Sequence, residues 1–558
     1  MQKKKAVLIS DFNLSNFQAL LNLDENNPII TADIVPFGQV MQYLVNGDSE
    51  IWKNKYDIAI IWLQPESIVN SYSQLFKNST LNENLLIEEV DQFINSIFNI
   101  AEKVNTIFIP LWNKPLHLRG SGLLSFKEGF DYALLKMNAR LVTRLAKSNT
   151  VHVLDTFRWI NTIGANAFNP KSWYMGKIPY TNEVFKEAIK DIKASLIAIY
   201  GQSKKVILVD LDDTLWGGIV GDDGWQNLNL GGHDSIGEAY LDFQKGLKYL
   251  KNRGIILGIV SKNEEKIALE AINLHPEMVL KKSDFTVFRI NWKDKANNIL
   301  EIANELNIGL QSIVFIDDNP FERALVRDAL PEVFVPDWPK NPMLYASSLL
   351  SMSCFDVAYL SNEDMVRNQM YKVEEKRSAL KTQMTSLDDW INSLEMKIII
   401  EKVGISNIVR VGQLFNKTNQ MNLSTRRMSE SELYGLCEQV SNSFFCIKVE
   451  DKFGDYGLTG IIGLHNNKNT LFITDFILSC RVMGRKVEET MLNFIFSKAE
   501  SLGLRLVKAE YLPTSKNKPC LDFFRKQQFI ETNYVFEMDV SDYSKTSFGI
   551  KVESNTFK

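Results

Sequence analysis

Short apolar runs alternate with amphipathic stretches along the first 200 residues of the chain. Apolar runs of strand length lie at residues 6–10, 57–63, 106–111 and 151–154. Apolar positions recur at helical spacing between them, as at 86–104 and 132–146, and a further helix is expected over about 181–200. Strands that alternate with helices predict a parallel, doubly wound sheet, so residues 1–200 are expected to form an α/β domain.

The α/β pattern continues beyond this region and then changes. Residues 203–340 repeat it, with strands expected at 206–209, 255–260, 286–290 and 313–316. A charged, helix-rich connector is expected at 341–385. Residues 386–541 combine strands at 397–403, 444–449, 460–464 and 471–478 with a helix at 487–502, which predicts an α+β domain. The polar tail at 542–558 is expected to be loose.

Composition narrows the class of function. At roughly 150 residues per domain, 558 residues predict three or four domains. The net charge is −4 with both signs spread along the chain, so no nucleic-acid partner is expected. No apolar run is long enough for a membrane span, and the short apolar run before Asp11 reads as a strand, not a signal peptide. Five cysteines without a CxxC pair indicate neither a zinc ribbon nor a disulfide framework, which favours the cytoplasm.

The strongest chemical signal follows the apolar run at 206–209. That run leads directly into Asp210-Leu-Asp-Asp-Thr214. In an open parallel sheet, chemistry gathers at the carboxyl ends of strands, so Asp210 and Asp212 leave the strand end together. One carboxylate can act as a nucleophile while the other moves protons. A carboxylate cluster repels phosphate, so a cation with hard oxygen ligands, Mg²⁺, is expected there.

Three further strand ends supply matching groups. Ser261 follows the strand at 255–260 and offers a hydroxyl to a phosphoryl oxygen. Lys295 opens a helix after the strand at 286–290 and places an ammonium where charge develops. Asp317 and Asp318 follow the strand at 313–316 and form a second acidic pair for the metal.

This order of signals resembles the haloacid dehalogenase (HAD) superfamily. The first HAD signature, DxDx(T/V), is matched by Asp210, Asp212 and Thr214. The resemblance implies that Asp210 forms an aspartyl-phosphate. It also implies that Asp212 is the general acid/base and lends a backbone carbonyl to Mg²⁺.

The later HAD signatures are similar to the remaining strand ends. The resemblance implies that Ser261 and Lys295 hold the phosphoryl group, with Lys293 as a rival for the lysine. It implies that Asp317 or Asp318 completes the metal shell, and the sequence leaves this choice open. The insert after residue 215 is too short for a large cap, so an open site is expected that admits a large substrate or another domain.

Long strings extend the resemblance over residues 1–541, to the FkbH-like proteins. The strings are DLDDTLWGGIVGDDG (210–224), FIDDNPFER (315–323), KTNQMNLSTRR (417–427), DKFGDYGLTG (451–460) and LSCRVMGRKVE (478–488). The resemblance implies a small phosphorylated acid of the 1,3-bisphosphoglycerate type as substrate. It also implies an acyl carrier protein as the partner that receives a glyceryl unit.

The C-terminal domain resembles the GNAT acyltransferases. Their pantetheine-phosphate loop, often R/QxxGxG/A, is similar to Arg481-Val-Met-Gly484-Arg485-Lys486, except that Lys486 replaces a small residue. That departure disfavours acetyl-CoA as the ligand, and carrier-borne phosphopantetheine is a natural alternative. The alternative is a basic helix start with no ligand.

Two other C-terminal features are candidate site residues. The polar block with Lys417, Asn419 and Gln420 is expected to have a substrate or interface role, the alternative being a loop. Cys480 precedes the basic loop, where Arg481 and the coming helix favour a thiolate that carries the acyl group. The alternative is a buried thiol that packs as a small hydrophobe.

The N-terminal domain faintly resembles the SGNH hydrolases, whose nucleophilic serine follows the first strand. Ser10 lies at that position, and Asp155 ends a later strand. The DxxH signature is missing because Arg158 stands where the histidine belongs, and the domain's histidines are His117 and His152. The expectation is a hydrolase-like fold without hydrolase chemistry.

Together these signals predict a multidomain α/β protein with a Rossmann-like HAD core between an SGNH- or flavodoxin-like domain and a GNAT-like α+β domain. The first functional hypothesis is a magnesium-dependent enzyme that dephosphorylates a small phosphorylated acid and passes its acyl unit to a carrier protein. The second is a stand-alone HAD phosphatase, and the third is a noncatalytic carrier-binding module.

Overall fold

The computed structural model describes most of the chain and divides it into two compact units, residues 1–197 and 198–558. The described residues are 3–36, 38–45, 50–77, 80–114, 118–119, 122–357, 377, 380, 384, 386–428, 430–514 and 516–554, without the side chains of 387, 417, 430 and 431. Most of the expected connector at 341–385, and His117, lie outside these ranges. Among the described residues, no helix has both the length and the apolar character of a membrane span.

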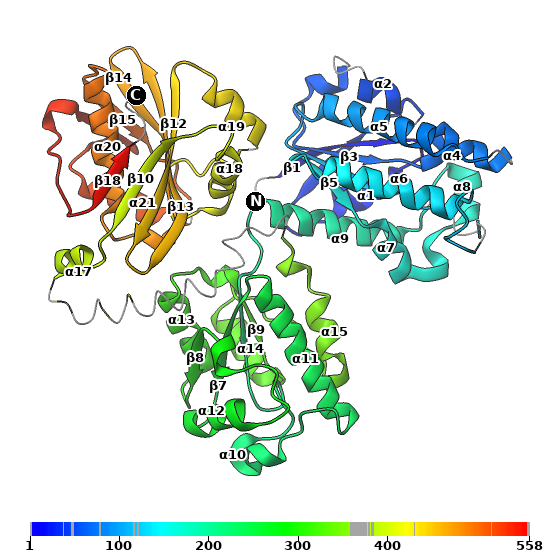
Figure 1. Ribbon diagram of the computed structural model, residues 1–558, viewed down its shortest axis with the longest axis horizontal. Helices are drawn as coiled ribbons and strands as arrows, with labels where there is room; N and C mark the ends of the chain where they lie inside the picture. The colour runs from blue at the N-terminus through cyan, green and yellow to red at the C-terminus, as the bar shows by residue number, and fades with distance from the viewer. Residues whose placement is uncertain are drawn as a thin grey trace. The chain divides into compact units, whose positions relative to one another are not determined.

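The first unit is a parallel α/β domain (Figure 1). Its five strands run in the order β2-β1-β3-β4-β5. They are β1 (Lys4–Ser10), β2 (Ile30–Ile34), β3 (Ile58–Trp62), β4 (Thr106–Pro110) and β5 (Val151–Leu154). Helices such as α5 (Glu83–Ile100), α6 (Phe130–Leu145) and α9 (Asn182–Ile199) connect and cover the strands. The sequence pattern predicted four of these strands and missed β2, a half-exposed edge strand.

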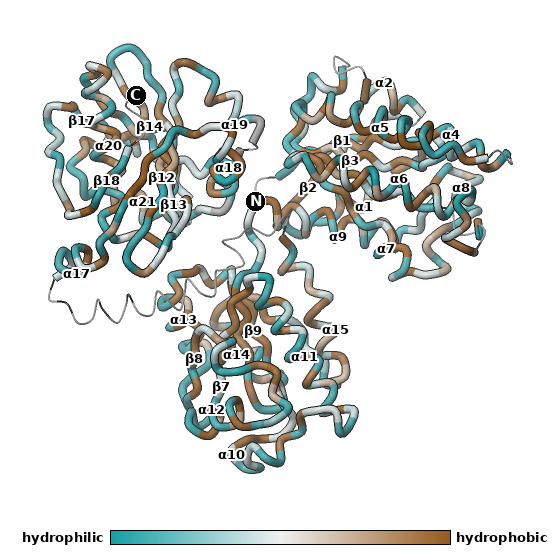
Figure 2. The backbone as a smooth tube through the Cα atoms, viewed as in Figure 1, coloured by the Kyte–Doolittle hydropathy of each residue, from teal (hydrophilic) through white to brown (hydrophobic). Residues whose placement is uncertain are grey.

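The centre of this sheet is strongly apolar (Figure 2). All five residues of β3 are buried, as are the last five of β1. Strands buried on both faces read as continuous apolar runs, as a parallel sheet covered by helices requires. The predicted doubly wound domain is therefore confirmed.

The second unit begins with a four-stranded parallel sheet in the order β8-β7-β6-β9. The strands are β6 (Val206–Val209), β7 (Ile256–Ser261), β8 (Val287–Ile290) and β9 (Ile313–Ile316). Helices α11 (Ser235–Asn252), α12 (Glu265–Leu274), α13 (Lys295–Glu305) and α14 (Pro320–Ala329) connect them. Within the described residues 210–234, the insert after β6 holds only α10 (Val220–Asp223) and a 3-10 turn and builds no cap over the sheet.

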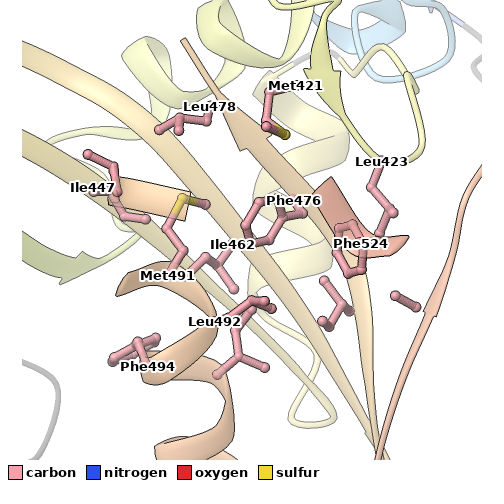
Figure 3. Close-up of a cluster of buried hydrophobic side chains, with 14 of the residues drawn as sticks. Met421, Leu423, Ile447, Ile462, Phe476, Leu478, Met491, Leu492, Phe494 and Phe524 are labelled. Atoms are coloured by element: carbon pink, nitrogen blue, oxygen red, sulfur yellow. The ribbon is translucent and has the colours of Figure 1, made fainter. Parts of the chain in front are cut away.

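The rest of the second unit is built on a mixed sheet, as an α+β domain requires. Its main path is β16-β17-β15-β14-β13-β12-β10-β18. The strands are β10 (Lys397–Lys402), β12 (Asn442–Asp451), β13 (Gly454–Asn467), β14 (Thr470–Leu478), β15 (Leu506–Glu510), β16 (Ile530–Thr532), β17 (Val535–Asp539) and β18 (Lys551–Ser554). Helix α20 (Val487–Ser501) packs its Met491 and Leu492 against sheet residues such as Phe476 (Figure 3).

One feature of this sheet differs from the sequence prediction, and a second was not predicted. The tail at 542–558 is not loose throughout, because β18 pairs in parallel with β10. Strand β14 pairs with β15 only from Thr470 to Ile473. Beyond that point a two-residue strand, β11 (Met421–Asn422), pairs with the end of β14.

Candidate active site

The carboxyl edge of the central sheet brings the predicted catalytic residues together. Asp210 directly follows β6, which lies between β7 and β9 in the sheet. Its backbone N–H donates to the carbonyl of Ile316 at 2.9 Å, which continues the β6–β9 pairing to the strand end. Ser261 is the last residue of β7 and Lys295 the first of α13, which follows β8. Groups from four chain segments therefore converge because parallel strands end at the same edge.

A buried lysine links two of the carboxylates. Lys295 Nζ lies 2.9 Å from Asp210 Oδ2 and 2.6 Å from Asp317 Oδ2. Burial opposes the charge of Lys295, but the two carboxylates outweigh it and raise the pKa of this ammonium. The rival Lys293 is exposed and lies 3.6 Å from Glu301, so Lys295 is the lysine at the centre.

Three carboxylates form a group that fits a metal ion. One oxygen from each of Asp210, Asp317 and Asp318 lies within 4.8 Å of the others. Asp210 Oδ1 is buried and, among the described residues, has no hydrogen-bond partner. Burial raises the pKa of Asp317 and of Asp318, and the charge of Asp210 raises both further. A hard divalent cation such as Mg²⁺ would offset that repulsion and give Asp210 Oδ1 a partner.

The two acids of the second pair have different surroundings. Asp317 is fully buried; one of its oxygens accepts from Lys295, and the other accepts the backbone N–H of Asn319 at 2.9 Å. Asp318 Oδ1 accepts the Thr214 hydroxyl at 3.0 Å, which leaves Oδ2 for a cation. This difference favours Asp318 as the direct ligand and Asp317 as the partner of Lys295.

Asp212 is held apart from this metal group. Its Oδ1 accepts the indole N–H of Trp216 and the backbone N–H of Val220, both at 3.0 Å, and its Oδ2 accepts from Asn263 Nδ2 at 2.8 Å. Burial raises the pKa of Asp212 despite these bonds. A fixed carboxyl group with a raised pKa suits proton transfer. The metal role expected of Asp212 involves only its backbone carbonyl. Its side chain is therefore not needed as a metal ligand and can transfer protons.

Three supporting residues were given no role from the sequence. Trp216 and Asn263 orient Asp212. Arg323 Nη1 donates to the backbone carbonyls of Asp317 at 2.7 Å and Asp318 at 2.6 Å, which fixes the peptide between them. Trp216 and Arg323 stand inside the quoted strings, and Asn263 lies two residues after Ser261, but their partners are not apparent from spacing. Ser261 is buried, and its Oγ accepts from Asn263 at 3.3 Å.

The C-terminal candidates lie near one another at the end of β14. Cys480 opens a 3-10 turn directly after this strand and is half-buried. Met421 pairs with Leu478, which lies two residues before Cys480. The polar block 417–427 therefore lies beside the strand end that carries Cys480. Asn419 Oδ1 accepts from Arg427, and Gln420 is half-buried beside it. The side chain of Lys417 lies outside the described residues.

The Gly484 amide and the Arg485 side chain of the predicted phosphate-binding loop are hydrogen-bonded to other residues of the same domain. The Gly484 N–H donates to Glu488 Oε1 at 2.7 Å, so a carboxylate already accepts this amide. Arg485 is 4% exposed, and its guanidinium lies over the Tyr456 ring and bonds the Tyr456 hydroxyl. In this structure Arg485 is therefore part of the domain core, and a phosphate-binding role for it stays a prediction. Arg481, half-buried, donates to Ser479 Oγ at 3.1 Å.

Ser10, the serine at the position of the SGNH nucleophile, makes the contacts of a structural residue. Ser10 is 2% exposed, and its Oγ accepts the backbone N–H of Phe12 at 3.2 Å. Asp155 caps α7 (Thr156–Ile163) by accepting the backbone N–H of Arg158. His152 lies in β5, where burial lowers its pKa to about 4. The SGNH likeness itself stays a prediction.

The central fold and its buried lysine–carboxylate cluster define a phosphatase domain of the HAD type. No family model matches the sequence, and no curated protein matches it. Among solved structures, the chain is similar to the N-terminal part of protein BF1531 from Bacteroides fragilis, which contains a phosphatase domain and is complexed with Mg. The identity is 30% and the TM-score 0.58, over 64% of this chain and 95% of that one. This chain belongs to the same family as that phosphatase-domain protein.

The chain is also similar to solved structures that cover only about a quarter of it. Spermidine N-acetyltransferase from Vibrio cholerae, in complex with CoA and spermine, is 16% identical over 26% of this chain and 98% of that one, with a TM-score of 0.22. A domain from Methanocaldococcus jannaschii is 13% identical over 26% and 99%, with the same TM-score. Likeness this small says nothing about chemistry in the C-terminal domain.

Proposed function

We propose that this protein is a magnesium-dependent phosphatase and acyltransferase. It removes a phosphoryl group from a small phosphorylated acid of the 1,3-bisphosphoglycerate type and loads the glyceryl, or a related acyl, unit on an acyl carrier protein. The observation that carries the phosphatase half is the buried Asp210 Oδ1, which has no hydrogen-bond partner among the described residues and lies beside Lys295 and two further carboxylates. The Mg complex of the related Bacteroides structure supports Mg²⁺ as the cofactor.

The phosphatase step follows from the contacts of the cluster. An Asp210 oxygen attacks phosphorus, and the bond from phosphorus to the substrate oxygen breaks. Asp212 gives its proton to that leaving oxygen and then takes a proton from the water that hydrolyses the aspartyl-phosphate. Lys295 and Ser261 hold the phosphoryl oxygens. Mg²⁺, held by Asp210, Asp318 and the Asp212 carbonyl, would neutralise the negative charge of the phosphoryl group.

The acyl-transfer step is assigned to the end of β14. Cys480 Sγ attacks the carbonyl carbon of the acyl phosphate, phosphate leaves with the bonding electrons, and the thiol proton passes to solvent. The phosphopantetheine thiol of the carrier then attacks this thioester and returns a proton to Cys480. Support comes from the polar side chains of Asn419 and Gln420, which the β11–β14 pairing brings to this strand end.

A stand-alone phosphatase is the second candidate. It is favoured by the internal use of the Gly484 amide and of Arg485, since neither is left for the phosphate of a pantetheine group. In this case the C-terminal domain would restrict the substrate and carry out no transfer.

Intact-mass analysis of holo-carrier proteins tests the proposal. Carriers are incubated with enzyme, Mg²⁺ and 1,3-bisphosphoglycerate, and phosphate release is measured in parallel. The native chain should show a glyceryl mass gain with phosphate release. Asp210→Asn cannot remove the phosphate ester, so it should show no glyceryl mass gain and only the heavier phosphoglyceryl product of the thiol step. Phosphate release without carrier acylation would leave the stand-alone phosphatase as the function. Carrier binding without release of phosphate from any substrate would identify a noncatalytic module.

A further inference from the structure

The N-terminal domain exposes five large apolar side chains at one edge of its sheet. Their exposed fractions range from 49% to 80%. They are Leu123, Leu124, Phe126, Tyr174 and Met175. The first three follow β4, and the last two belong to α8 (Pro170–Gly176), which follows β5. The Tyr180 hydroxyl, four residues after α8, donates to Asn113 Oδ1, three residues after β4, at 2.8 Å, so both segments lie at the carboxyl edge of the sheet.

These side chains stand on ordered backbone. The Phe126 N–H donates to Leu123 O at 3.1 Å, which forms a turn below the apolar segment. The end of α8 is tied to the segment after β1, since Asn13 Nδ2 donates to Gly176 O at 3.0 Å and the Asn13 N–H donates to Lys177 O at 2.9 Å. Apolar side chains gathered on an ordered surface mark an interaction site, whereas scattered single ones do not.

The same two segments are basic, although the chain as a whole is acidic. Of the described residues at 118–119, 122–128 and 170–177, four are exposed cations and one is an exposed acid, Glu128. The cations are Arg119, Lys127, Lys171 and Lys177. The difference of four and one gives a local charge of +3, against a net charge of −4 for the chain. A basic rim around apolar side chains is complementary to an acidic protein that also exposes apolar groups.

We propose that this apolar-basic surface is where an acidic protein partner docks. The acceptor of the proposed function is a carrier protein, and such carriers are small and acidic, so the choice of partner rests on that function. The surface itself is independent of the proposed function, because it lies in a domain that gives no residue to the phosphatase cluster. In this proposal the N-terminal domain recognises the carrier and the later domains perform the chemistry.

Binding of a labelled holo-acyl carrier protein to the full-length chain tests the proposal by fluorescence anisotropy. Asp210→Asn serves as the background, so that turnover does not affect the measurement. Leu124→Ser with Tyr174→Ser, and separately Lys127→Glu with Lys171→Glu, should each weaken binding by about tenfold or more. The charge variant should also lose the salt dependence of the affinity.

A matched control changes the opposite edge of the same domain. Leu23, 77% exposed before β2, and Lys147, exposed before β5, are replaced by serine and glutamate together. This control should bind the carrier within about twofold of the background chain. Circular dichroism should show an unchanged fold for all variants, because every substituted side chain is exposed.

Three outcomes overturn the proposal. Unchanged carrier affinity in both surface variants would remove this surface as the docking site. Sedimentation with phosphatidylglycerol–phosphatidylcholine vesicles that only the surface variants lose, at unchanged carrier affinity, would make it a membrane surface. Self-association that the same variants abolish, again at unchanged carrier affinity, would make it a contact between copies. Surface-dependent binding without acylation would refute the proposed transfer reaction and leave this inference standing.

Discussion

Thr214 and Asp318 hold each other through two hydrogen bonds. The Thr214 hydroxyl donates to Asp318 Oδ1 at 3.0 Å and accepts the Asp318 backbone N–H at 3.0 Å. Thr214 is fully buried, so both bonds are shielded from water. The pair connects the nucleophile loop to the second acidic loop, 104 residues later in the chain. Its effect is to fix the carboxylate that the geometry favours as a metal ligand.

Removing this hydroxyl should weaken the metal site without dismantling the fold. Thr214→Val keeps the shape of the side chain and loses both bonds, and a supporting partner of this kind is worth roughly ten- to a hundredfold in metal affinity. Calorimetric titration with Mg²⁺ measures the change, and Thr214→Ser should restore most of the affinity. Thr143→Val, which removes an exposed hydroxyl on α6, is the control. Equal Mg²⁺ affinity in Thr214→Val and the native chain would contradict this role.

Asp210→Asn should abolish phosphate release. An amide oxygen is a poor nucleophile, so the rate should fall by about four to six orders of magnitude. The side chain keeps its size, so thermal unfolding should remain cooperative and close to that of the native chain. The measurement is phosphate release from a phosphate ester at saturating Mg²⁺, because attack of Cys480 on an acyl phosphate would also release phosphate. A variant with near-normal turnover would remove Asp210 from the nucleophile position.

Activity should require Mg²⁺, and the two acids of the second pair should contribute differently. Chelation should stop phosphate release, and added Mg²⁺ should restore it, because the carboxylate cluster otherwise repels a phosphate. Asp318→Asn should weaken Mg²⁺ binding more than Asp317→Asn, since both Asp317 oxygens already have partners. Full activity after exhaustive chelation would contradict the assignment of a Mg²⁺ site to this cluster. A larger loss of Mg²⁺ affinity in Asp317→Asn would reverse the order of the two acids.

The convergence of the strand-end residues could be predicted from the sequence because that signal is local. Asp210 and the acidic pair at 317–318 each follow an apolar run directly, and the parallel topology then brings them together. The open choice between Lys293 and Lys295 needed the structure, since only contacts distinguish them. The edge strand β2 was missed because it is half-exposed and carries no long apolar run.

Long-range partners are the part that spacing cannot show. Asn263 reaches Asp212 across 51 residues of chain. The burial of Arg485 could not be predicted for the same reason, since Tyr456, which covers it, lies 29 residues earlier. A basic residue in a loop motif reads as exposed, and only the packed domain shows that it is part of the core.

Ser10→Ala should leave phosphate release and acyl transfer nearly unchanged. The Ser10 hydroxyl is buried and accepts the Phe12 N–H, so its removal should cost only about 1 kcal/mol of folding free energy. Both rates and the denaturant midpoint are measured on the full chain. A large loss of either rate at preserved stability would show hydrolase-type chemistry in the N-terminal domain.

Cys480 is the residue on which the acyl-transfer half of the proposed function depends. It is half-buried at the end of β14, beside the segment that carries Asn419 and Gln420, whereas Cys446 and Cys520 are fully buried. Enzyme incubated with Mg²⁺ and the bisphosphorylated donor, without carrier, should accumulate a thioester that peptide mapping locates at Cys480. Cys480→Ala should lose this adduct and carrier acylation while it keeps phosphate release, since the phosphatase cluster does not involve the thiol. Cys437→Ala, which removes another half-buried thiol of the same domain, should keep the adduct, carrier acylation and phosphate release. If Cys480→Ala forms the same adduct, or acylates carrier at the native rate, the thiol only packs against its neighbours. Transfer would then proceed directly from the acyl phosphate to the carrier thiol.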